Sequence, residues 1–359
     1  MAVNHISDWL RRQLDNPQIV ILLLIILVVA VTLYFFGGML APLLAAVVIA
    51  YLLQGLVGRL EQRRVPHLAA VLLVFFSFFV ALVFAFFGLL PLLIRQVTQL
   101  AQQVPSIVAA LQNSLLALPQ RFSLITERQI QDLLSGLSTE VIGVGQTLLT
   151  YSLSSLVTAF TIGVYLVLVP ILVFFLLKDS QVIVTWFTRF LPEHRPLTNQ
   201  VWSEVDRQIG NYARGKIWEI LIVGTAAFIA FRLLGLQYAL LLAVLTGVSV
   251  LIPYIGALVV TIPVTAVAFF QWGLQPDFYW VFFAYGLIQF LDGNVLVPLL
   301  FSEAVNLHPV AIIAAILLFG GLWGIWGVFF AIPLATVIQA VLRAWPDEIQ
   351  TEPVVPDEN

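Results

Sequence analysis

The stretch "LLLAVLTGVSVLIPYIGALVVTIPVTAVAFF", residues 240–270, is apolar along its length but holds two glycines and two prolines. A second stretch, "AIIAAILLFGGLWGIWGVFFAIPLATVIQAVL", residues 311–342, has the same character. In hydrocarbon, an interrupted helix leaves backbone N–H and C=O groups unpaired, so it persists only where protein or a water-filled cavity meets the backbone. The alternative is two kinked helices that span a membrane, because Gly and Pro are common in such helices.

The composition places the chain in the membrane class. Of 359 residues, 61% are hydrophobic and 10% are charged, and the mean hydropathy is +1.03, whereas a soluble chain carries about a quarter charged residues. The net charge of -3 is spread along the chain and does not indicate nucleic acid. The absence of cysteine excludes disulfides, thiolate metal sites and cysteine nucleophiles.

The apolar runs predict an all-α polytopic membrane protein with about eight hydrophobic segments. The first run is long enough to cross a hydrocarbon core of about 30 Å, and it exceeds the apolar core of a signal peptide. The uninterrupted runs are residues 19–36, 39–58, 68–94, 152–177, 217–234 and 278–300, and the Gly/Pro-interrupted tracts are 240–270 and 309–342.

Basic residues in the connections set the expected orientation. Twelve Lys and Arg residues fall on one side and four on the other if the N-terminus is cytoplasmic, which satisfies the positive-inside rule. Both termini are then expected in the cytoplasm. Lys216 is interpreted as a positive anchor where a helix enters the membrane, and Glu219 and Arg232 as anchors that reach the two interfaces.

The chain is expected to divide as follows. The predicted parts are N-terminal transmembrane helices (1–94), an extracytoplasmic amphipathic segment around Pro105 (95–150), a transmembrane helix (151–177), a cytoplasmic interfacial helix after a turn at "LPEHRP" (178–216), a transmembrane transport core (217–345) and a disordered acidic tail (346–359). The apolar stripe of the interfacial helix comprises Trp202, Val205, Ile209 and Tyr212, and packing on neighbouring helices explains it as well as a direct role in transport.

Motifs for catalysis are nearly absent, and no enzyme activity or cofactor is expected. "GNYARGKI", residues 210–217, has the spacing of a phosphate loop, but Ile217 replaces the Ser or Thr that holds magnesium and a helix precedes it. The histidines His5, His67 and His194 form no metal cluster, and His308 precedes a helix start.

The two interrupted tracts share a faint internal repeat. "IGALVVTIPV" and "WGVFFAIPL" each contain a glycine, a short apolar stretch and an Ile-Pro. If each tract turns back at its break, the two units have opposite orientation, as in transporters with a site at the midplane. Eight crossings and six crossings plus two re-entrant hairpins both remain open, because the flanking connections lack Lys and Arg.

Asp292, in "IQFLDGNVLVP" (residues 288–298), is the ionisable residue in the middle of an apolar run. Ionising a carboxylate there is costly, and such residues usually mark transport sites. Gln289 and Asn294 could hydrogen-bond a polar solute, and Tyr254 could act as a gate or stacking surface. The alternative is a structural Asp at a loop-like break at Gly293, paired with a neighbouring helix.

Several motifs together resemble the autoinducer-2 exporter family, which includes PerM-like permeases. They are "PYIG" followed by Ile-Pro, then "QFLDGNVLVP", "NLHP" and "GGLWGIWGVFFAIPLA", with weaker matches such as "PLLAAVVIAYLL" and "FFLLKD" over most of the chain. The resemblance implies bacterial inner-membrane homo-oligomers, with a pentamer as one expected assembly, that export autoinducer-2 or exchange sodium for protons. Family members usually have Glu where this chain has Asp292, which shortens the reach of the acid by one methylene.

The sequence therefore predicts a transporter of a small polar solute, in contact with the lipid bilayer and driven either by an H⁺ or Na⁺ gradient or by facilitated diffusion. An oligomeric channel and a membrane scaffold are the rival hypotheses. The candidate substrate or ion site comprises Gln289, Asp292, Gly293, Asn294, Pro298, Pro253, Tyr254 and Gly256 with the glycines Gly320, Gly321, Gly324 and Gly327.

Overall fold

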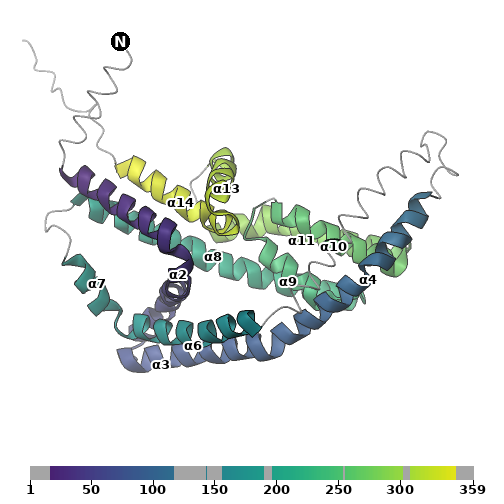
Figure 1. Ribbon diagram of the computed structural model, residues 1–359, viewed down its shortest axis with the longest axis horizontal. Coiled ribbons are helices and arrows are strands. Elements are labelled where there is room, and N and C mark those ends of the chain that lie inside the picture. The colour runs from purple at the N-terminus through teal and green to yellow at the C-terminus, as the bar shows by residue number, and fades with distance from the viewer. Residues whose placement is uncertain are drawn as a thin grey trace, which may run out of the picture. The chain divides into compact units, whose positions relative to one another are not determined.

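The computed structural model describes residues 17–116, 143, 156–189, 196–253, 255–301 and 308–344, and every regular element in these ranges is a helix (Figure 1). The predicted all-α class is confirmed. Within the described ranges, four helices are long and apolar enough to cross a membrane, and a fifth span arises if α6 (Leu156–Lys178) and α7 (Ser180–Thr188) count as one bent span. The chain is therefore a multi-pass membrane protein.

The chain divides into two compact units. The first comprises Met1–Ala41, Gln181–Tyr212 and Glu303–Asn359, and the second comprises Pro42–Ser180 and Ala213–Ser302. The unit boundaries differ from the division expected from the sequence because they pass through two continuous helices, α2 (Pro17–Gln62) and α8 (Pro196–Leu233).

Helix α2 corrects the prediction of two separate N-terminal spans. The runs 19–36 and 39–58 form one helix, with Gly37, Gly38 and Pro42 inside it. A glycine in a helix costs only about 1 kcal/mol relative to alanine, so an apolar helix can continue through it. The part of this helix that is long and apolar enough to cross a membrane is Met39–Gln62. The turn that two antiparallel spans require is absent between residues 36 and 39.

Helix α3 (His67–Phe84) continues through a short π-helical segment, η1 (Ala85–Leu89), into α4 (Leu90–Leu116). The apolar run and the amphipathic segment that follows it are thus one helical path, and Pro105 lies inside α4 rather than between helices. Residues 117–142 and 144–150 of the predicted extracytoplasmic segment lie outside the described residues.

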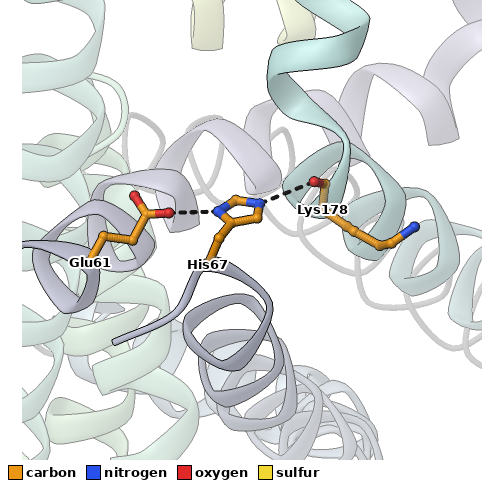
Figure 2. A network of polar contacts seen from close by, with 3 residues as sticks. All are labelled: Glu61, His67 and Lys178. Atoms are coloured by element: carbon orange, nitrogen blue, oxygen red, sulfur yellow. Dashed lines mark hydrogen bonds and ion pairs between the residues drawn. The ribbon is translucent and has the colours of Figure 1, made fainter. Parts of the chain in front are cut away.

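Helices α2, α3 and α6 pack together in the second unit around small and branched side chains. The buried cluster contains Ala46, Ala50, Val57, Ala70, Val71, Val74, Val173 and Leu177. Figure 2 shows how the polar ends of these helices are joined: His67 Nδ1 lies 2.6 Å from Glu61 Oε1, and His67 Nε2 lies 3.1 Å from the Lys178 carbonyl oxygen. A carboxylate and a carbonyl only accept hydrogen bonds, so both contacts form together when the ring donates through both nitrogens.

Helix α8 corrects the prediction of a cytoplasmic interfacial helix that is separate from the next span. Its stripe residues Trp202 and Tyr212 and the whole apolar run from Ile217 lie on one unbroken helix. The sequence from 196 to 216 contains no proline after Pro196 and no Gly-Pro or Asn-Gly pair, so nothing local ends the helix before Lys216. Residues 190–195, which contain most of the predicted "LPEHRP" turn, lie outside the described part.

The first interrupted tract folds as two helices joined by a turn, one of the two arrangements that the sequence left open. Helix α9 (Ala239–Ser249) ends before the turn at Val250–Pro253, and α10 (Ile255–Trp272) follows. The two helices bury a shared core with α8 and α11 (Pro276–Leu291) that includes Ala227, Phe231, Leu242, Ala243, Val260, Val264, Val267, Val281 and Tyr285. A Cβ on Gly256 would overlap Ser249 O and lie 2.6 Å from Ser249 C, so only glycine allows this approach.

The second interrupted tract, in the first unit, is also two helices joined at a break. Helix α13 (Pro309–Trp323) ends at Gly324, whose φ of 61° is in the left-handed region, and α14 (Ile325–Ala344) follows. A Cβ on Gly327 would overlap Phe319 O. Gly327 therefore plays the part in this hairpin that Gly256 plays in the first, which gives the faint sequence repeat a structural counterpart. The described residues do not include the tail after Ala344.

Candidate functional site

The helix that carries Asp292 does not break at Gly293. Helix α11 passes into a π-helical segment, η2 (Asp292–Leu296), and then into α12 (Val297–Phe301). Asp292 is the first residue of η2, and its backbone N–H still bonds to Ile288 O and Gln289 O. The loop-like break considered as the alternative is thus wrong. A single π-helical turn inside an α-helix is frequent at functional sites, because it changes the direction of the side chains that follow.

A buried ion pair on α8 is the main polar feature that the sequence interpretation missed. Lys216 Nζ lies 2.7 Å from Glu219 Oε2, and the two side chains are 9% and 2% exposed. They stand three residues apart and so on one face of the helix. The prediction that Lys216 is a solvated anchor and that Glu219 reaches the interface is wrong, because α8 extends beyond them on both sides.

The surroundings of Lys216 include two other segments of the second unit, the turn after α9 and helix α12. Nζ donates a hydrogen bond to the carbonyl oxygen of Val250, at 2.8 Å, in the turn after α9. The ring of Phe301, in α12, has its centroid 5.1 Å from Nζ. A Cβ on Gly215 would lie 2.6 Å from the Phe301 ring, so α12 packs directly on α8. The lysine therefore lies where α8, the α9–α10 turn and the helix of Asp292 meet.

The close crossing of α8 and α9 brings the turn to the lysine. A Cβ on Gly247 would lie 2.8 Å from Ile220 O and 3.0 Å from Gly224 Cα. The two backbones are in direct contact there, and the glycines on both helices permit it. Because α9 ends at Ser249, two residues after this crossing, the Val250 carbonyl lies within reach of a side chain from α8.

Asp292 faces the same cluster. Its Oδ1 is buried and has no hydrogen-bond partner among the described residues. The ammonium of Lys216 attracts the Asp292 carboxylate, and the Asp292 and Glu219 carboxylates repel one another. One cation thus faces two acids in a buried region. Burying a charge is costly unless it is paired. Lys216 can neutralise only one of the two carboxylates, so the other needs a proton or a second cation.

The other predicted residues are placed as follows. Gln289 is half-buried one helical turn before Asp292, near the hydroxyl of Tyr285. That hydroxyl donates to the Ala257 carbonyl at 2.7 Å, which fixes α11 against α10. Asn294 donates to the Phe290 carbonyl of its own helix at 2.9 Å, and it is exposed, as are Gly293 and Pro298.

Of the residues predicted at the breaks, Pro253 is half-buried in the turn after α9, and Gly256 lies at the close approach described above. Tyr254 lies outside the described residues. Gly320, Gly321, Gly324 and Gly327 all belong to the α13–α14 hairpin of the first unit. Gln289 therefore lies beside Tyr285 on the α10 side of α11, Asp292 lies on the helical path that reaches α8 through Phe301, and the carboxamide of Asn294 is used within its own helix.

Within the described ranges, no group of three or more His, Cys, Asp or Glu side chains could hold a metal ion. A signal for the missed pair is visible in the sequence: Lys216 and Glu219 have opposite charge at a spacing of three on an apolar helix. Their partner Val250 is 34 residues further along the chain, and no local pattern predicts that contact.

The comparisons with known proteins concern the family of the chain. A model of the AI-2E family transporter family matches residues 23–347. The chain is 47% identical over 343 residues to "Putative permease PerM" of Escherichia coli (strain K12), which covers 95% of this chain and 97% of that protein. It is 28% identical over 306 residues to "Putative transport protein YueF" of Bacillus subtilis (strain 168), over 83% and 82% of the two chains. These relatives are named as transport proteins rather than enzymes, and the chain belongs to the AI-2E family of transporters.

Proposed function

We propose that this protein is a secondary transporter of the bacterial inner membrane that exports a small polar solute of the autoinducer-2 type in exchange for H⁺ or Na⁺. The observation that carries the proposal is a buried Lys216–Glu219 ion pair packed by Phe301 from the helical path of Asp292, whose Oδ1 is buried without a hydrogen-bond partner among the described residues. Asp292, with an unpaired buried oxygen, is the group that takes up the coupling ion.

The cluster supports coupling for a physical reason. With Asp292 ionised, the three described groups Lys216, Glu219 and Asp292 carry one excess negative charge, which attracts a proton or a cation from whichever side is open to water. With Asp292 neutralised, Lys216 and Glu219 balance one another. The two states differ by one charge, so an ion gradient can drive the exchange between them. The proposal includes homo-oligomers with both termini in the cytoplasm, and it favours neither ion.

The test compares two acids of the same helix. Asp292→Asn is reconstituted in proteoliposomes, with Asp277→Asn, an exposed residue of the first turn of α11, as the matched control. Autoinducer-2 flux is followed under an imposed H⁺ gradient and under an imposed Na⁺ gradient. We expect gradient-driven flux to fall to background in Asp292→Asn and to persist in Asp277→Asn.

Four results would contradict the proposed coupled export of the solute. Equal gradient-driven flux in Asp292→Asn and in the native protein would remove the acid from the mechanism. Ion conductance without solute coupling would indicate an oligomeric channel. Exchange of Na⁺ against H⁺ with no movement of autoinducer-2 would indicate an antiporter, and the solute assignment would be wrong. The absence of all flux from the native protein would indicate a scaffold.

A further inference from the structure

The turn between α9 and α10 depends on a side chain from another helix. A helix that ends leaves its last carbonyls without intrahelical partners, and in an apolar region such groups need other donors. Within the turn, Leu251 N–H donates to Val248 O and Ile252 N–H to Ser249 O. Pro253 has no N–H to contribute. The carbonyl of Val250 accepts from Lys216 Nζ, at 2.8 Å. Lys216 therefore holds part of the break in place.

The same ammonium is also the counter-ion of the acids. Nζ is 2.7 Å from Glu219 Oε2, and its charge acts on Asp292. An ammonium has three N–H donors on one point, so a shift of Nζ towards one acceptor alters its distance to the others. The backbone of the turn and the charge of the two acids are thus connected through one atom.

From this geometry we infer that Lys216 is the positioning residue that couples the charge of Asp292 to the conformation of the α9–α10 turn. The inference rests on the proposed function and adds that the α9–α10 turn is the segment that changes conformation. When Asp292 is neutral, Lys216 stays with Glu219 and the Val250 carbonyl, and the turn is closed. When Asp292 is ionised, it draws Nζ away, the carbonyl loses its charged donor, and the turn opens.

The groups that face Nζ support this assignment. Glu219 lies on the same helix, Asp292 on η2, Val250 in the turn, and the Phe301 ring on α12. Arg214 is directed to a different neighbour, since its Nη1 would lie 3.6 Å from a Cβ on Gly55 of α2. The packing of Phe301 on Gly215 limits the path of the ammonium to the side of the acids and the turn.

The experiment uses the natural absence of cysteine. Leu251→Cys places a single thiol in the turn, in the full-length protein in lipid nanodiscs, and the rate of reaction with a neutral maleimide is measured from about pH 5 to about pH 9, a range that brackets strongly shifted carboxyl groups. Rates are divided by those of Gln275→Cys, in the exposed connection between α10 and α11, to remove the pH dependence of thiol chemistry.

We expect the normalised rate at Leu251→Cys to rise by about tenfold as Asp292 ionises, the factor that corresponds to 1.4 kcal/mol. Asp292→Asn should fix the rate at its low-pH value. Lys216→Met should abolish the pH dependence, whereas Lys178→Met, which removes the other lysine of the chain, should leave it unchanged. A flat profile in the native background, or a normal profile in Lys216→Met, overturns the inference.

Lys216→Met could unfold the protein because it leaves Glu219 buried without a counter-ion. The double variant Lys216→Met/Glu219→Leu removes both charges together and keeps Asp292, since replacement of a buried pair by apolar residues is often tolerated. It should also show no pH dependence, and a native profile in it overturns the inference. Loss of gradient-driven flux in Asp292→Asn with a labelling rate that still responds to pH would keep the proposed function and overturn only the role of Lys216. Retained gradient-driven flux in Asp292→Asn with a flat labelling profile would overturn the proposed function and keep the role of Lys216.

Discussion

The replacement Gly256→Ala tests the hairpin on which the site is built. A Cβ at this position would overlap the carbonyl oxygen of Ser249 and lie 2.6 Å from its carbonyl carbon, whereas ordinary van der Waals contact starts at 3.4 Å. Because the obstructing atoms belong to the backbone, no side-chain rotation relieves the overlap. Helices α9 and α10 must move apart, which loosens the core contacts between them. Overpacking costs about 1–3 kcal/mol in a well-packed core, and we expect the upper end, about 3 kcal/mol.

Gly286→Ala is the matched control. Gly286 lies within α11, and nothing stands within 4 Å of a Cβ built on it. Alanine is favoured over glycine in a helix by about 0.5–1 kcal/mol, so this variant should be as stable as the native protein or slightly more stable. The assay is thermal unfolding of the purified protein in detergent, followed by the amount of monodisperse protein that remains after heating. If Gly256→Ala unfolds at the same temperature as Gly286→Ala, the close approach of the two helices is wrong, and with it the placement of the turn beside Lys216.

Three further predictions concern single contacts and use the same unfolding assay. Lys216→Met should destabilise the protein by about 3–5 kcal/mol, since it leaves a buried carboxylate unpaired. Lys216→Met/Glu219→Leu should recover most of that loss. A double variant no more stable than the single one would contradict a buried ion pair between Lys216 and Glu219. Gln271→Ala removes two hydrogen bonds to the backbone of the α8–α9 connection, at 2.8 Å and 2.9 Å, and should cost about 1–3 kcal/mol, whereas an unchanged unfolding temperature would show that water replaces them. Glu61→Gln, which removes the charge facing His67, should cost less than about 1 kcal/mol because both side chains are well exposed, and a larger loss would mean that the contact is shielded from water.

The sequence predicted the helical class and the two interrupted tracts because those features are local. Gly256, Pro253 and the glycines of the second tract interrupt apolar runs, and the helices end beside them. Asp292 was identified for the same reason, since an acid in an apolar run has few explanations other than function.

The predictions that failed concern the ends of helices and contacts between distant residues. The end of an apolar stretch in the sequence does not mark the end of a helix. The polar residues between Trp202 and Lys216 are helical, so α8 is longer than its apolar part. A charge near the end of an apolar run can be a solvated anchor or a buried partner, and the choice depends on what packs against it. For Lys216 the deciding contacts are Val250 and Phe301, which come from other helices.

The π-helical segment at Asp292 has a consequence for how this helix can vary. An α-helix has 3.6 residues per turn, so deletion of one residue from η2 would rotate everything after it by about 100° relative to α11. Phe301 would then leave the face that packs on Gly215, although every side chain of the segment could be chemically unchanged. The length of η2 therefore determines the angle around the helix axis between Asp292 and the Phe301 ring that contacts Lys216. Substitutions along this segment should therefore be tolerated far better than the loss or gain of a single residue.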